Sequence, residues 1–94
     1  MKKLILLLLF IPLVSSGQNS KIKDFKITIL STMLSDTHIG EWGFSAMIEA
    51  DGQKILFDTG SREKTVLQNA KELKINLDNI DNVFLSHNHK DHTG

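Results

Sequence analysis

The chain has 94 residues, with eleven lysines and arginines against eleven acidic residues, and it contains no cysteine. Its lysines are scattered, so no basic patch offers a surface for the phosphate backbone of a nucleic acid. The lack of cysteine excludes disulfide bonds, a lipid-anchored cysteine and thiolate metal ligands, so any bound metal would need nitrogen and oxygen donors.

The first 17 residues resemble a secretory signal peptide. Lys2 and Lys3 form a basic start, an apolar run with one proline extends to Val14, and small residues follow as far as Gly17. A membrane-spanning helix needs roughly 20 apolar residues, so this shorter run favours a cleaved signal over an uncleaved anchor. Cleavage after Gly17 would leave nine basic and eleven acidic residues. The sequence therefore predicts an exported protein, periplasmic or secreted, with no stable membrane anchor.

A polar spacer over residues 18–24 precedes the first predicted strand. Residues 25–30 alternate between apolar and polar side chains and include β-branched residues, which indicates a strand. Residues 35–43 have no apolar period and are expected to form a loop. A mature segment this short would bury only ~60% of its unfolded surface. We therefore expect residues 25–94 to be the leading part of a larger domain.

An antiparallel hairpin is expected next in the chain. Its strands would be residues 44–50 and 54–57, which are largely apolar. The dipeptide Asp51-Gly52 lies between them, and a type I′ hairpin turn favours this pair because both central residues need positive φ.

A helix and a short strand complete the predicted order. Ser61 can cap a helix whose apolar side chains recur at helical spacing. These side chains belong to Val66, Leu67, Ala70 and Leu73. Residues 83–85 are apolar and would form a strand that ends just before Ser86. The sequence therefore predicts the order β-β-β-α-β.

Three of the four histidines lie within six positions, in the pattern His-x-His-x-Asp-His. Residues two apart in an extended segment point the same way, so His87 and His89 can bind one metal ion. Asp91 and His92 follow after a turn and can face a second ion about 3.5–4 Å away. Such donors suit zinc, and also iron or manganese. The alternative is a histidine-rich surface turn that binds metal only adventitiously.

Asp58 follows the apolar segment 55–57, near the place where the histidines are expected to emerge from the sheet. Histidines that bind metal usually donate their second N–H to a carboxylate or carbonyl, which fixes the ring. We expect Asp58 to support the cluster in this way. The alternative is that Asp58 only starts a turn or caps the helix near Ser61.

Residues 55–60 and 85–94 resemble the two opening motifs of the metallo-β-lactamase fold superfamily. One branch of it includes the dihydropterin ribofuranosylaminobenzene-phosphate synthase-like proteins. The residues that resemble this branch are 43–45, 69–70, 75–77, 80–81 and 83. The resemblance implies an α/β (α+β) fold, an αββα sandwich, of which this chain would hold the N-terminal β-β-β-α-β part. It also implies two divalent metal ions, most simply zinc, bound by His87, His89, Asp91 and His92.

The predicted function is a metal-dependent hydrolase of a small-molecule substrate. Paired metals lower the pKa of a shared water, and the hydroxide would attack an ester, amide or phosphoester. Asp91 would be catalytic by orienting that water. One alternative is a synthase or transferase acting on pterin-like, phosphorylated substrates, against which export argues. The other is a catalytically incomplete fragment, which describes the isolated 94-residue chain best, because two metal sites need more ligands than it offers.

Overall fold

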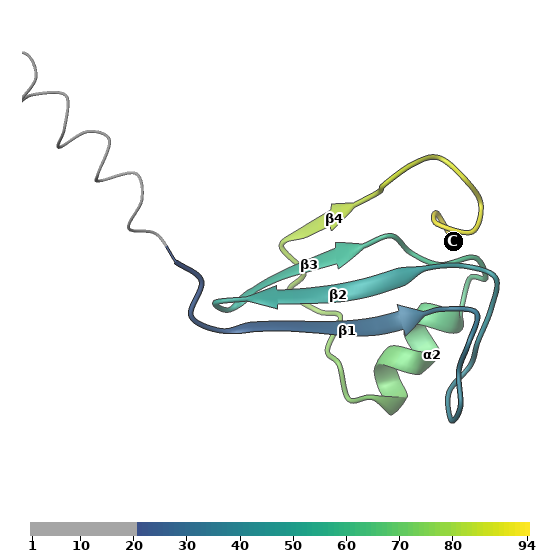
Figure 1. Cartoon of the computed structure of the whole chain (residues 1–94), viewed down its shortest axis with the longest axis horizontal. Helices are drawn as coiled ribbons and strands as arrows, with labels where there is room; N and C mark the ends of the chain where they lie inside the picture. The colour runs from purple at the N-terminus through teal and green to yellow at the C-terminus, as the bar shows by residue number, and fades with distance from the viewer. Residues whose placement is uncertain (1–20) are drawn as a thin grey trace, which may run out of the picture.

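The computed structural model describes residues 21–94, which form a four-stranded mixed sheet and one helix (Figure 1). The elements are β1 (Phe25–Ser31), β2 (Ser45–Ala50), β3 (Gln53–Phe57), α2 (Thr65–Glu72) and β4 (Asn82–Phe84). The strands lie in chain order. β1, β2 and β3 are antiparallel neighbours, whereas β4 runs parallel to β3. The predicted order is confirmed, and each strand begins and ends within one residue of its predicted bounds.

Two predictions fall on the start of the chain. The predicted signal peptide, residues 1–17, lies outside the described residues. Across residues 21–94, the structure has no helix with the length and apolar character that a membrane span requires.

The hairpin between β2 and β3 turns at Asp51 and Gly52, as predicted. Their φ angles are 48° and 82°, both positive, as a type I′ turn requires. Ala50 pairs with Gln53 directly across the turn. The Asp51 carboxylate also accepts a hydrogen bond of 2.8 Å from the backbone amide of Asp24. The turn residue thus also fixes the chain that enters β1.

The helix does not begin where the sequence predicted. Ser61 does not cap it: α2 begins at Thr65, and its N-cap residue Lys64 makes no side-chain capping bond. The backbone amides of Ser61 and Arg62 instead donate to the carboxylate of Glu41, each at 2.8 Å. Because that distant side chain takes both amides, residues 61–64 stay outside the helix.

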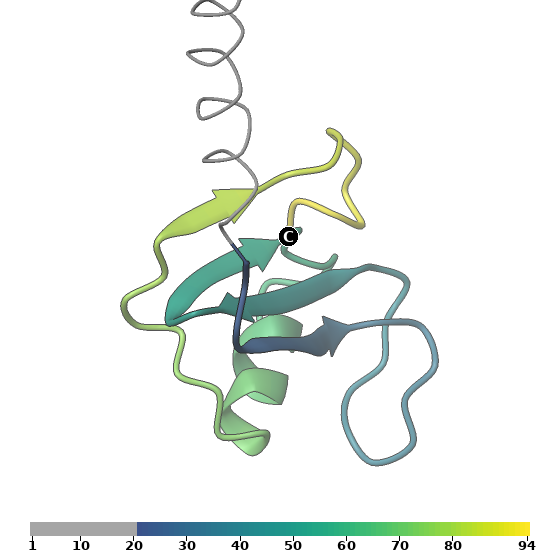
Figure 2. The same ribbon diagram turned by 60° about the vertical axis from the view of Figure 1, so that its left-hand side comes forward.

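α2 lies against one face of the sheet (Figure 2), and the hydrophobic core lies between them. It is formed by Leu30, Met47, Leu56, Val66 and Ala70. Leu67, which shares the predicted apolar spacing, is 58% exposed and takes no part in the core. The helix therefore buries only a narrow stripe of its surface, which includes Val66 and Ala70, against the sheet.

The opposite face of the sheet is apolar and is not covered by any described residue. It carries a shallow groove of about 300 Å³. The groove is lined by Ile27, Ile29, Phe44, Ala46, Ile48 and Phe57. The described residues thus form a small α+β unit of one sheet and one helix, and a second sheet of the predicted αββα sandwich is not among them.

Candidate functional site

The candidate site lies where β3 and β4 end. Because these strands are parallel, their carboxyl ends meet at the same edge of the sheet. Phe57 pairs with Phe84, and their rings stack with centroids 5.3 Å apart. Asp58 follows one strand, and the segment that starts at Ser86 follows the other. The segment then folds back, and the Thr59 amide donates to the carbonyl of His92 at 2.9 Å.

Asp58 is the buried centre of the site. Its side chain is shielded from solvent, and its φ of 55° turns the chain sharply at the end of β3. Its carboxylate accepts bonds of 2.7 Å from both the amide and the hydroxyl of Ser86, and lies 2.6 Å from His92 Nδ1. Burial alone would raise the pKa of Asp58, but the bonds from Ser86 and the contact with His92 lower it below its ordinary value. The carboxyl group is therefore ionised near neutral pH.

These bonds fix the proton positions on two histidine rings. An ionised carboxylate can only accept, so the Ser86 hydroxyl donates its one proton to Asp58. His87 Nδ1 lies 2.8 Å from that hydroxyl and must therefore donate to it. His92 Nδ1 likewise donates to Asp58. Both rings thus carry a proton on Nδ1, which leaves Nε2 of each neutral ring as the atom that can bind a metal ion.

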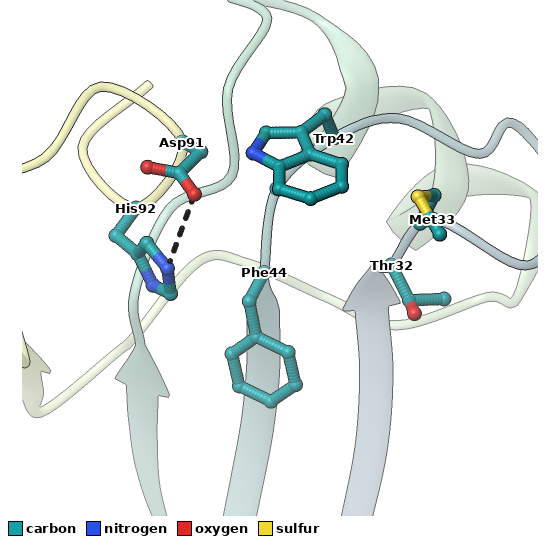
Figure 3. A pocket seen from close by; sticks show the side chains of 7 residues that line it. Thr32, Met33, Trp42, Phe44, Asp91 and His92 are labelled. Carbon is teal, nitrogen blue, oxygen red and sulfur yellow. Dashed lines mark ion pairs between the residues drawn. The ribbon is translucent and has the colours of Figure 1, made fainter.

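The three clustered histidines lie together in the fold. The ring centroid of His87 is 4.6 Å from that of His89 and 4.1 Å from that of His92. The His92 amide donates to the His89 carbonyl at 3.0 Å, which closes the turn expected before Asp91 and His92. Asp91 Oδ2 lies 3.5 Å from His92 Nε2 (Figure 3). The predicted pairs are therefore neighbours, while the metal-ligand roles of the four residues stay predictions.

The predicted ligands do not form a complete metal site in the described part of the chain. Between residues 21 and 94, no group of three or more histidine, aspartate or glutamate side chains is arranged to hold one ion. The physical reason is the number of donors: four residues divided between two ions give two each, fewer than a protein metal site needs. The chemistry of the donors still fits a divalent ion, because His87 and His92 present free Nε2 atoms. The described residues can supply only part of such a site.

His38 is the histidine outside the cluster. Its Nδ1 lies 3.0 Å from a carboxylate oxygen of Glu72, at the end of α2. It forms no described contact with the cluster.

Glu41 is a buried carboxylate that the sequence did not reveal. It accepts four hydrogen bonds, from Ser31 Oγ at 2.7 Å, the Ser61 amide at 2.8 Å, the Arg62 amide at 2.8 Å and Thr65 Oγ1 at 2.9 Å. Burial alone would raise its pKa, but these bonds lower it below its ordinary value. A Cβ on Gly60 would lie 2.5 Å from Glu41 Oε1, so glycine is required there. Glu41 thus fastens the loop before β2 to the chain that follows Asp58.

A shallow cavity of about 310 Å³, wide open to solvent, lies beside the cluster (Figure 3). It is lined by Thr32, Met33, Trp42, Gly43, Phe44, Asp91 and His92. The Phe44 amide donates to the Asp91 carbonyl at 3.0 Å and joins the two segments. A Cβ on Gly43 would lie 2.9 Å from that carbonyl, so only glycine allows this close approach. The sequence predicted a loop over residues 35–43, and it gave no sign that Trp42 or Gly43 lines a cavity, because this loop has no apolar period and no metal-binding motif.

Comparisons with known proteins identify the family. A family model described as "Anti-Pycsar protein Apyc1" matches residues 14–94. The 7,8-dihydropterin-6-methyl-4-(beta-D-ribofuranosyl)-aminobenzene-5'-phosphate synthase of Methanocaldococcus jannaschii is 38% identical over 81 residues. The match covers 79% of this chain and 28% of that protein, which its name describes as an enzyme. The chain thus spans about 28% of the length of this relative.

These findings correct the predicted assignment to the metallo-β-lactamase superfamily. The matching family model is that of Apyc1, and the relative is named a synthase. The predicted metallo-hydrolase is unsupported, whereas the synthase alternative agrees with the name of the relative. A short histidine motif reports local chemistry and does not by itself define a family or a reaction.

The predicted signal peptide is not supported either. The family match begins at residue 14, inside the range predicted for that peptide. Export remains a prediction that no observation on the described residues tests. The family model matches residues 14–94, which is well over half of the chain. The chain therefore belongs to the Anti-Pycsar protein Apyc1 family.

Proposed function

We propose that this chain is part of an enzyme of the dihydropterin-type synthase kind, acting on a pterin-like, phosphorylated small molecule. The observation that carries the proposal is the network around Asp58, which holds His87 and His92 with free Nε2 atoms beside a cavity. The 38% identity to the named synthase supplies the substrate class. An ordered set of polar side chains at the mouth of a pocket is the arrangement that small-molecule sites use.

The proposed cofactors are divalent metal ions, most simply two zinc ions. His87, His89, Asp91 and His92 would provide part of their ligands. Such an ion supplies a Lewis acid that offsets negative charge on a phosphorylated substrate. Asp58 keeps the rings of His87 and His92 aimed through their Nδ1 atoms. Asp91 is the proposed catalytic carboxylate, because it lines the cavity and lies 3.5 Å from His92 Nε2.

The test is formation of the compound in the relative's name. The aromatic amine of the ribofuranosyl-aminobenzene phosphate would displace a phosphoryl leaving group from the 6-methyl carbon of an activated dihydropterin, with loss of the amine proton. We expect the purified enzyme of which this chain is part to form the product and to lose activity with a chelator. His87→Ala should lower kcat/KM by at least about 100-fold, because loss of a ligand should cost no less than loss of the residues that support ligands. His38→Ala is the matched control, because it removes the histidine outside the cluster, and it should retain activity. Full activity in His87→Ala, or turnover of a phosphodiester with no pterin product, would contradict the proposal.

The family match favours a second candidate, an activity against Pycsar, as the family description states. Expression of the protein in a cell with an active Pycsar system distinguishes the two. Loss of Pycsar activity in that cell, with no pterin product from the purified protein, would favour the second candidate.

A further inference from the structure

We infer that the cavity beside Asp91 and His92 binds the planar heteroaromatic ring of the substrate, and that Trp42 is the surface on which this ring stacks. This inference rests on the proposed function for the identity of the ring, a pterin. The shared chemistry also fits a nucleobase, and the experiment below separates the two.

The exposure of Trp42 is the first observation. Its side chain is 72% exposed and lines the cavity. An exposed tryptophan leaves a large apolar surface in contact with water, which is unfavourable. A ligand that covers the indole at the cavity wall would remove this cost. Figure 3 shows the indole between the Asp91–His92 pair and Met33, with Phe44 below it. Planar heteroaromatic rings of different chemical structure can all stack on such a surface, because each has a flat π-face.

The charge of the cavity is the second observation. Its lining contains neither lysine nor arginine, and its ionisable side chains are those of Asp91 and His92. No cationic side chain of the lining would bind a phosphate group, so within this cavity only a metal ion at the Asp91–His92 edge would attract one. A neutral planar ring fits this lining better, and the volume of about 310 Å³ lies within the usual range for a small-molecule pocket.

The connection to the cluster is the third observation. Gly43 lets the Trp42 loop approach Asp91 closely, and the Phe44 amide bonds to the Asp91 carbonyl at 3.0 Å. The Phe44 ring centroid is 6.4 Å from that of His92. A backbone hydrogen bond therefore joins the loop that carries Trp42 to the segment that carries Asp91 and His92. A ring bound against Trp42 has its substituents beside Asp91 and His92.

Binding without metal tests this inference independently of activity. We would measure Kd by isothermal titration calorimetry in chelated buffer, with 6-methylpterin, cytidine 5′-monophosphate and ribose 5-phosphate as probes. Trp42 is the only tryptophan of the 94 residues, so quenching of its fluorescence reports on this wall alone. Trp42→Ala should weaken binding of the planar probe by about tenfold, the usual effect of removing a stacked aromatic. Trp42→Phe keeps an aromatic ring and should recover most of the affinity.

Leu34→Ala is the matched control, because Leu34 is 82% exposed and does not line the cavity. Its Kd should equal that of the wild type. Binding of cytidine 5′-monophosphate but not of the pterin would support the ring site and contradict the proposed substrate. The inference is overturned if neither planar probe binds, if Trp42→Ala binds as well as the wild type, or if ribose 5-phosphate binds equally well.

Discussion

At the scale of single residues, the arrangement of the histidine cluster depends on Asp58. The sequence placed this residue at the end of a strand and left open whether it supports the histidines or starts a turn. The structure shows its carboxylate in contact with Ser86 and His92. The spacing of the histidines could be read from the sequence. Ser86 as the link between Asp58 and His87 could not, because the link depends on where two separate strands end.

Asp58→Asn should destabilise the protein by about 3 kcal/mol. The new amide N–H₂ would face the N–H or O–H donors of Ser86 and His92, and the negative charge that these donors stabilise would be lost. Urea unfolding followed by circular dichroism measures this change. Asp78→Asn is the control, because Asp78 is exposed and its carboxylate makes no described hydrogen bond. It should shift the free energy of unfolding by no more than about 0.5 kcal/mol. Equal effects of the two substitutions would mean that the Asp58 network contributes no stability.

At the scale of elements, local patterns predicted the strands and the hairpin correctly. Alternating side chains define a strand, and Asp51-Gly52 defines the turn, without reference to the rest of the chain. The start of α2 was mispredicted because Glu41, some 20 residues earlier, takes the amides of Ser61 and Arg62. A buried glutamate in an irregular loop gives no sequence signal, since glutamate is usually exposed.

Glu41 should make the stability of the fold depend on pH. Its pKa is lowered in the folded protein, so its contribution is fully present above the ordinary value of 4.5 and is lost as the pH falls through the lowered value. Between about pH 6 and about pH 3, the wild type should lose more stability than Glu41→Gln, in which this group no longer titrates. Urea midpoints at each pH give the comparison, and the exposed Glu63→Gln is the control. Parallel profiles for the wild type and Glu41→Gln would exclude this role.

At the scale of the whole molecule, the sequence predicted the α+β class but not the family. The class follows from the order of elements, whereas the family rests on similarity along residues 14–94. Among residues 21–94, the sheet has one face against α2 and one apolar face that no described element covers, with Ile27 and Ile29 exposed by 53% and 45%. Each Å² of such surface is unfavourable by about 25 cal/mol. The described unit therefore gains stability from only one side of its sheet.

The proton positions on His87 and His92 test the account most directly. Long-range proton–nitrogen NMR of the histidine rings at alkaline pH distinguishes the two tautomers. We predict that both rings carry the proton on Nδ1, because Ser86 and Asp58 accept from these atoms. Ser86→Ala should release the tautomer of His87 and leave that of His92 unchanged. A proton on Nε2 of His87 in the wild type would contradict the account. So would a His87 tautomer that is the same in Ser86→Ala as in the wild type.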